Sequence, residues 1–124
     1  MDLIAELVQV LGPAHVLTGD DRAGHIGDWT GKYTADPVAV VRPANTDEVA
    51  ACLRIAAKHG VAVVPISGRT GLVGGAMTRG GLMISVERMN KIREIRPEAR
   101  IAVVEAGVIL DRLHEAADAE GLYF

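Results

Sequence analysis

Six of the 14 glycines in this chain lie in one short segment, PISGRTGLVGGAMTRGG, which spans Pro65 to Gly81. Glycine loses more backbone freedom on folding than any other residue, so a fold that gathers it in one place has a local need for it. The segment follows VAVVPI, a β-branched run that predicts a buried strand over Val61–Ile66. Glycines after a strand allow positive φ and close backbone approach, and successive N–H groups can then converge on an anion. The sequence therefore predicts either a phosphate-binding loop or a flexible connection that binds nothing.

Two familiar phosphate loops do not match this segment. The P-loop pattern, Gly-x-x-x-x-Gly-Lys-Ser/Thr, requires a Gly-Lys pair, which the segment lacks. The Rossmann pattern, Gly-x-Gly-x-x-Gly, opens a helix. Here the glycines stand at 68, 71, 74 and 75, and LMISV at Leu82–Val86 predicts a strand instead. If the segment binds phosphate, it does so as a different kind of loop.

Charge placement favours a bound anion. From Val49 to Val86 there is no Asp or Glu, although the chain as a whole carries a net charge of −3. Cations in such a segment attract an anion within about a Debye length, roughly 8 Å at physiological salt. The basic residues of the segment are Arg54, Lys58, Arg69 and Arg79.

The remaining pattern predicts an α+β domain with a small mixed β-sheet and helices on one face. Helices are expected over residues 2–11, from Thr46 to His59–Gly60, and over Leu110–Glu120, with Thr46 as a cap. The inner face of the second helix is expected to be Val49, Cys52, Leu53 and Ala56. Further strands are expected over Val38–Pro43, Leu82–Val86, Ile92–Ile95 and Ile101–Gly107. Residues 18–36 are polar and glycine-bearing, which predicts an irregular arm.

Size and composition exclude several classes of protein. A chain of 124 residues that is 49% apolar is typical of one globular domain. The negative net charge gives no general attraction to nucleic acid or anionic membranes. No apolar run approaches the roughly 20 residues that span a bilayer. The single Cys52 cannot form an intrachain disulfide, and the N-terminal segment lacks the basic start of a signal peptide, so we expect a cytoplasmic protein.

Several motifs together give the chain a family resemblance. The segments are VPISGRTGLVGG, MISVERMNKI and VVEAGV, with DWTGKY and AVVRPANTDEVAACLRIAAKHGVAVVP before them. From about Asp28 to the end, the chain resembles the FAD-linked oxidases of vanillyl-alcohol oxidase type. The nearest branch is that of the D-2-hydroxyacid dehydrogenases: D-2-hydroxyglutarate dehydrogenase, D-lactate dehydrogenase and the flavin subunit of glycolate oxidase.

The resemblance implies that the glycine loop binds the pyrophosphate of FAD through backbone N–H groups, with Thr70 adding a hydroxyl donor. The implied binding residues are Ser67, Gly68, Arg69, Thr70, Gly71, Leu72 and Gly75. Ser67 and Arg69 stand where this branch commonly has Gly and Asn. Arg69 is therefore expected either to reach a phosphate or to crowd the pocket. Relatives with covalent flavin carry His at this position, and Arg cannot form that bond, so FAD is expected to be non-covalent.

Family members run to several hundred residues, and this chain ends before their second glycine-rich segment. The resemblance therefore implies an N-terminal helix and arm over 1–35 and the first lobe of the FAD-binding domain over 36–124. The parent enzyme would oxidise a D-2-hydroxy acid, while the chain alone is expected to be inactive and to form a homo-oligomer. Two alternatives stay open: a non-enzymatic module that self-associates or binds a partner without flavin, and an unrelated phosphate-binding domain.

Other polar residues do not form a recognisable site in the sequence. The four histidines are scattered without the spacing of metal ligands, and no catalytic residue or metal site is expected. Glu105–Gly107 resembles a family motif near the cofactor but also fits a structural turn. Trp29 and Tyr33 are expected to anchor the arm to the core or to cover a ligand.

Overall fold

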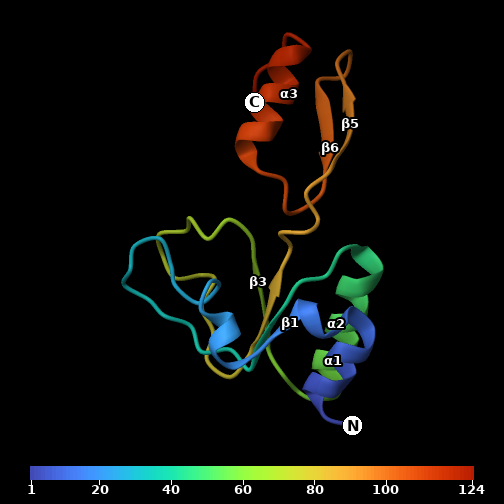
Figure 1. Cartoon of the computed structure of the whole chain (residues 1–124). Coiled ribbons are helices and arrows are strands. Elements are labelled where there is room, and N and C mark those ends of the chain that lie inside the picture. Colours follow the sequence, from blue (N-terminus) through green and yellow to red (C-terminus); the bar gives the residue numbers. More distant parts are fainter.

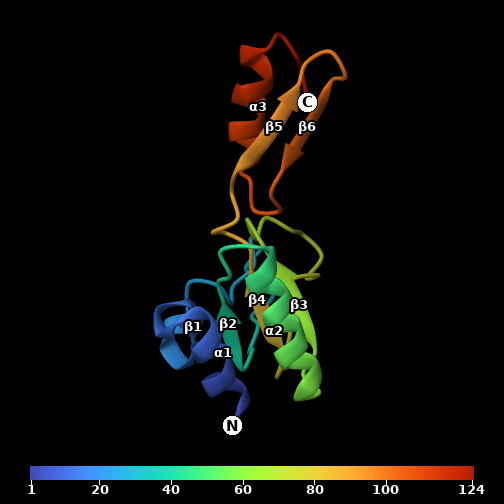
Figure 2. The ribbon, with the colours of Figure 1, turned by 90° about the vertical axis from the view of Figure 1, so that its right-hand side faces the viewer.

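The computed structural model describes all 124 residues, which form two parts joined end to end (Figure 1). The larger part holds the N-terminus, a four-stranded sheet and two α-helices. The smaller part holds a two-stranded hairpin and the C-terminal helix. Figure 2 shows the same separation after a 90° turn.

The four-stranded sheet has the order β1-β2-β4-β3. These strands are Val16–Leu17 (β1), Ala39–Val41 (β2), Leu82–Ser85 (β4) and Val63–Ile66 (β3). β1 is antiparallel to β2, whereas β2, β4 and β3 run parallel. This arrangement confirms the predicted mixed sheet and the α+β class. β4 is central and all four of its residues are buried.

Two layers cover the sheet, one on each face. The α-helices Leu3–Leu11 (α1) and Thr46–Lys58 (α2) pack on the face that carries Ala39, Val41, Leu82 and Ile84. Val40 and Met83 alternate to the other face. There they meet Ala35 and Ile26 of the arm and Met77 of the glycine-rich segment. The predicted helix layer is confirmed, and the irregular arm is the second layer.

β3 differs from its prediction, because it is an edge strand of which only Ile66 is buried. It also begins later than expected. The backbone N–H of Val61 donates to the Ala56 carbonyl at 2.9 Å, so this residue still belongs to the end of α2. The β-branched run therefore predicted the presence of the strand correctly, but it did not predict where the strand begins or how little of it is buried.

Two details of α2 also correct the prediction. The cap is Asn45, whose side-chain oxygen accepts the Glu48 backbone N–H at 2.9 Å, and Thr46 is the first helical residue. Leu53 is 46% exposed, and Ile55 packs against the core in its place. Cys52 and Ala56 are buried as expected. Burial raises the pKa of the Cys52 thiol to about 11, consistent with a core residue rather than a reactive one.

The two helices are joined by an ion-pair cluster around Glu6. Its carboxylate accepts from Lys58 Nζ at 2.6 Å and also contacts His59 Nε2 at the end of α2. The hydrogen bond from Lys58, followed by that from His59, lowers the pKa of Glu6 to about 2. The pKa of Glu6 in the folded chain lies below the ordinary value of 4.5. The ionised carboxylate therefore contributes its full stabilisation above about pH 4.5, and this contribution is lost as the pH falls toward 2.

We expect Glu6→Gln to lower the free energy of unfolding at pH 7. The difference from the unchanged chain should shrink as pH falls from about 4.5 to about 2, because protonation removes the same charge from Glu6. Urea unfolding at several pH values measures this. A difference that stays constant over that range would show that the charge of Glu6 does not stabilise the helix pair.

The smaller part departs from the expected single sheet. Ile92–Arg96 (β5) and Ile101–Val104 (β6) pair only with each other, and Leu110–Ala119 (α3) follows them. The strands were predicted, but their separation from the main sheet was not. None of the helices has the length and apolar character needed to cross a bilayer.

Candidate functional site

The glycine loop leaves the carboxyl end of β3 and lies at the junction between the two parts. In Figure 1 it is the yellow-green segment below the C-terminal part. Residues Ser67–Val73 are all exposed. Ligands in sheets with parallel strands commonly bind beyond the carboxyl ends of those strands, which is where this loop sits.

The backbone of the loop has free hydrogen-bond donors. No N–H group from Ser67 to Ala76 donates to another group of the protein. Ordered proteins pair most backbone donors with protein or water. Ten consecutive N–H groups on a largely exposed loop therefore remain open to water or to a bound ligand, and phosphate oxygens can accept from such groups.

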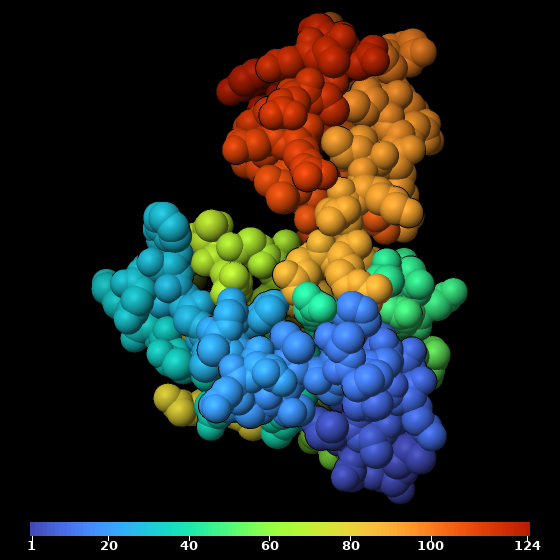
Figure 3. All heavy atoms as spheres, in the orientation of Figure 1, coloured from blue at the N-terminus to red at the C-terminus, as the bar shows by residue number.

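A cleft of about 530 Å³ lies between this loop and the smaller part. Figure 3 shows the hollow between the yellow-green loop and the red C-terminal atoms. Its loop wall is Ser67, Gly68, Arg69 and Thr70, and its other lining residues are Glu87, Asn90 and 107–111. This volume lies within the usual range of small-molecule sites, roughly 300–1,000 Å³.

The structure thus divides the predicted binding residues. Ser67–Thr70 line the cleft, whereas Gly71 and Gly75 line a separate hollow of about 20 Å³ beside Asp28. That hollow is large enough for about one water molecule. Leu72 is 65% exposed and lines neither space.

Of the two reasons expected for glycines in this loop, positive φ and close backbone approach, the first does not apply to Gly71. Its φ is not positive; between Ser67 and Ala76 the left-handed residues are Arg69, with φ 56°, and Gly74, with φ 73°. A Cβ on Gly71 would meet nothing within 4 Å. Gly71 is therefore not needed for the bend of the loop, and only close approach by a ligand would require a glycine there.

The expected concentration of positive charge at the loop does not form. Lys58 pairs with Glu6, and neither Arg54 nor Arg79 lines the cleft. Arg69 lines it, but its Nη1 donates to the backbone carbonyl of Gly24 in the arm. An anion in the cleft would therefore be held mainly by backbone N–H groups.

Sequence reasoning missed most of the opposite wall. The first residues of α3 lie there, and no side chain caps that helix at Ile109. The N–H groups of Leu110 and Asp111 have no protein acceptor, so a second set of backbone donors faces the loop. The only signal in the sequence was Glu105–Gly107, which leads into this helix.

Glu105–Gly107 was expected to be either a motif near the cofactor or a structural turn, and the surroundings of Gly107 support a structural role. A Cβ there would fall far inside contact distance of the Val86 carbonyl oxygen and 2.8 Å from the Met89 carbonyl oxygen. Its own N–H donates to the same Met89 oxygen at 2.8 Å. Gly107 is thus required where the two parts meet, and it also lines the cleft.

Glu87 brings a negative charge to the cleft. Its Oε1 lies 2.9 Å from His25 Nε2 and 3.6 Å from Arg42 Nη1. Partial burial raises the pKa of Glu87, but the hydrogen bond from His25 and the charges of His25 and Arg42 outweigh it, so the net pKa is lowered. The cleft therefore combines backbone donors with two acidic residues, the ion-paired Glu87 and Asp111 at the start of α3.

The arm contacts the loop through one of its two aromatic residues. The ring of Tyr33 lies 3.3 Å from the position of a Cβ on Gly74, whereas Trp29 is 70% exposed. Asp28 fixes the turn between them, since its carboxylate accepts from the Thr30 hydroxyl and from the Tyr33 N–H at 3.1 Å. These bonds, the Thr30 hydroxyl first, lower the pKa of Asp28. Tyr33 thus anchors the arm to the loop, whereas most of the Trp29 side chain is exposed.

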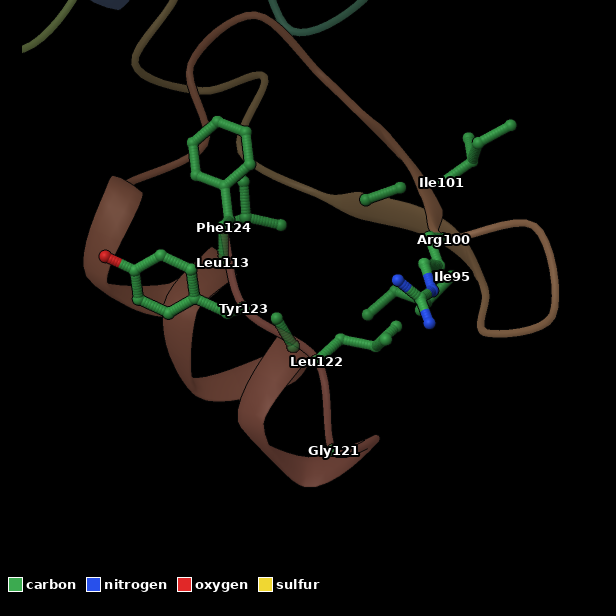
Figure 4. Close-up of a pocket in the computed structure, with 10 residues that line it drawn as sticks. Ile95, Arg100, Ile101, Leu113, Gly121, Leu122, Tyr123 and Phe124 are labelled. Carbon is green, nitrogen blue, oxygen red and sulfur yellow. The ribbon is translucent and has the colours of Figure 1, made fainter.

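A second hollow, of about 320 Å³, lies within the smaller part (Figure 4). It opens between the hairpin and α3 and is mostly apolar. Its apolar lining includes Ile95, Ile101, Leu113, Leu122 and Phe124. No polar cluster accompanies it, and no group of three or more His, Cys, Asp or Glu that could hold a metal occurs in the structure.

Comparison with protein families gives a match over most of the chain. A family model described as "FAD binding domain" matches residues 37–124. D-2-hydroxyglutarate dehydrogenase from Xanthomonas citri is 39% identical over 98% of this chain, and glycolate oxidase subunit GlcD from Bacillus subtilis is 38% identical over 99% of it. The chain spans only about a quarter of these relatives, 26% and 27% of their lengths.

Solved structures give the same fold. 4-Ethylphenol oxidase from Gulosibacter chungangensis matches 96% of this chain with a TM-score of 0.84 and 29% identity. p-Cresol methylhydroxylase matches 97% with a TM-score of 0.82 and 26% identity. In each case the matched region is 24% of the solved chain. Both parts of this structure are therefore arranged as in larger oxidases.

Proposed function

The chain belongs to the family of FAD-binding domains, and from that premise we propose that it binds the pyrophosphate of FAD on its glycine loop, as part of a D-2-hydroxyacid dehydrogenase or oxidase. One observation carries the proposal: Ser67–Thr70, the first four of ten consecutive residues whose N–H groups have no protein acceptor, line a cleft of about 530 Å³. Backbone donors of this kind suit phosphate oxygens without needing cations.

The residues present fit the cofactor. The backbone of Ser67–Thr70 would hold the pyrophosphate, and the N–H groups at the start of α3 would face it across the cleft. When bound, flavin supplies a hydride acceptor for the oxidation of C2 of a hydroxy acid.

The substrate class rests on the relatives, which are named D-2-hydroxyglutarate dehydrogenase, D-lactate dehydrogenase and glycolate oxidase subunit. All three names specify 2-hydroxy acids. The division into a helix and arm over 1–35 and a lobe over 36–124 stays a prediction, as does the cytoplasmic location. The chain spans about a quarter of these relatives, and we propose that it does not turn over substrate alone.

Titration of FAD into the purified chain tests the proposal. Quenching of flavin fluorescence should show weak, saturable binding, because only one side of the cofactor would be enclosed. Acid precipitation should release all of that flavin, since Arg69 cannot bond to it covalently. Dye reduction with D-lactate, D-2-hydroxyglutarate or glycolate should stay at the buffer control. Absence of saturable binding up to millimolar FAD would refute the proposed site.

A second candidate, self-association without flavin, has its own observation. The hollow in Figure 4 is apolar, and β6 is an exposed edge whose Ile101 and Val103 are 46% and 37% exposed. Apolar surface beside an open strand edge favours pairing between copies.

We therefore expect the chain to form a homo-oligomer. Light scattering over a concentration series measures this, and Val103→Lys should shift the distribution toward monomer, because charge on an edge strand opposes pairing. Exposed Val10→Lys on α1 is the matched control. A monomer at every concentration would contradict self-association and leave FAD binding unaffected.

A further inference from the structure

The two walls of the cleft are tied to the same short piece of the arm. Arg69, on the loop wall, donates from Nη1 to the carbonyl of Gly24. Glu87, on the wall after β4, lies 2.9 Å from Nε2 of His25. Gly24 and His25 are adjacent, so one dipeptide contacts both walls. Arg69 is 45 positions from Gly24 in the sequence, and Glu87 is 62 positions from His25.

The arm that carries this dipeptide is itself held in place. Arg22 donates to Asp36 at 2.9 Å and also to the Pro37 carbonyl. Ala35 donates from its backbone to Ile26 at 2.8 Å, closing the arm across its base. The side chain of His25 is only 15% exposed. Gly24–His25 is thus a fixed point rather than the tip of a loose loop.

The backbone of Arg69 gives an independent indication. Its φ of 56° places a non-glycine residue in the left-handed region, which L-residues with a Cβ disfavour. Such a conformation persists only where surrounding contacts hold it. The hydrogen bond to Gly24 is the side-chain contact that Arg69 makes. The arm therefore holds the loop in a bend that its sequence does not favour.

We propose that Gly24–His25 is a brace that positions the glycine loop for FAD by holding Arg69 and Glu87 at a fixed separation. Arg69 and Glu87 are then positioning residues, and Arg69 acts on the cofactor through the loop backbone. The effect of the brace on FAD affinity rests on the proposed function, whereas the contacts that form the brace are present in the chain without FAD.

The test compares FAD affinity in three variants of the full chain. Arg69→Asn removes the guanidinium and keeps a residue that tolerates positive φ. Glu87→Ala removes the contact to His25, and Glu87→Gln keeps an acceptor for it. We expect Arg69→Asn and Glu87→Ala each to weaken FAD binding about tenfold, and Glu87→Gln to retain most of the affinity.

The double variant Arg69→Asn/Glu87→Ala separates a brace from two independent contacts. If both residues act through one dipeptide, the double variant should bind FAD about as weakly as either single variant. Independent contacts would instead multiply to about a hundredfold loss. Independent losses, or unchanged affinity in all variants, would overturn the proposal.

Trypsin digestion of the chain without FAD gives a readout that does not depend on the cofactor. Loss of the brace should speed cleavage after Arg22 and Lys32 in Glu87→Ala but not in Glu87→Gln. Equal cleavage rates would overturn the brace. Failure of the unchanged chain to bind FAD would instead refute the proposed function, and the digestion would then decide the brace alone.

Discussion

Gly107→Ala should destabilise the chain by about 3 kcal/mol, at the upper end of the range for overpacking a close contact. The added Cβ would collide with the carbonyl oxygens of Val86 and Met89. Both are backbone atoms, so relief requires the chain after β4 to move rather than a side chain to turn. Urea unfolding measures the loss.

The same substitution should also weaken FAD binding. Gly107 lines the cleft and leads into α3, so a shift there moves one wall relative to Ser67–Thr70. Gly27→Ala is the matched control, because a Cβ at Gly27 meets nothing within 4 Å and its φ is not positive. Equal stability of the two variants would show that the close approach at Gly107 is not required.

Gly71→Val should have the opposite profile: near-normal stability with FAD affinity lowered at least a hundredfold. Open space surrounds the position, and surface changes of this kind usually alter stability by less than about 0.5 kcal/mol. The expected loss of affinity rests on position: Gly71 follows Thr70, so the added bulk lies next to the backbone that is proposed to hold the phosphate oxygens. Fluorescence titration and urea unfolding measure the two quantities.

Leu72→Ala is the control for this variant. It shortens an exposed side chain and keeps the backbone N–H, so FAD affinity should not change. Normal FAD affinity in Gly71→Val would mean that the pyrophosphate does not lie against this part of the loop. Loss of affinity in Leu72→Ala would indicate side-chain rather than backbone contacts.

Local sequence signals predicted the elements of this fold well. The apolar spacing of α1, the position of α2 and the β-branched runs of β2 and β4 each depend on neighbouring residues, and all were found. Details that depend on packing were less accurate. Leu53 and Ile55 are two positions apart on α2, and only the contact with α1 and the sheet decides that Ile55 is the inner one.

The candidate site depended more on distant contacts, and half of it could not be read from the sequence. The glycine loop was evident because its composition is unusual. Glu87 and the start of α3 reach the cleft only through the turn at Gly107. The direction of the Arg69 side chain depends on the arm, 45 residues earlier. Neither long-range contact produces a periodic pattern in the sequence from which it could be predicted.

The most direct measurement is an FAD titration of the ¹⁵N-labelled chain followed by its amide resonances, which reports each backbone N–H separately. We expect the largest shifts at Ser67–Leu72, with smaller shifts at Leu110 and Asp111 across the cleft. ADP, which carries the same pyrophosphate, should shift the loop amides, and riboflavin, which carries none, should not. Saturable shifts confined to the apolar hollow of the smaller part, with the Ser67–Leu72 amides unmoved, would show that FAD does not bind on the glycine loop.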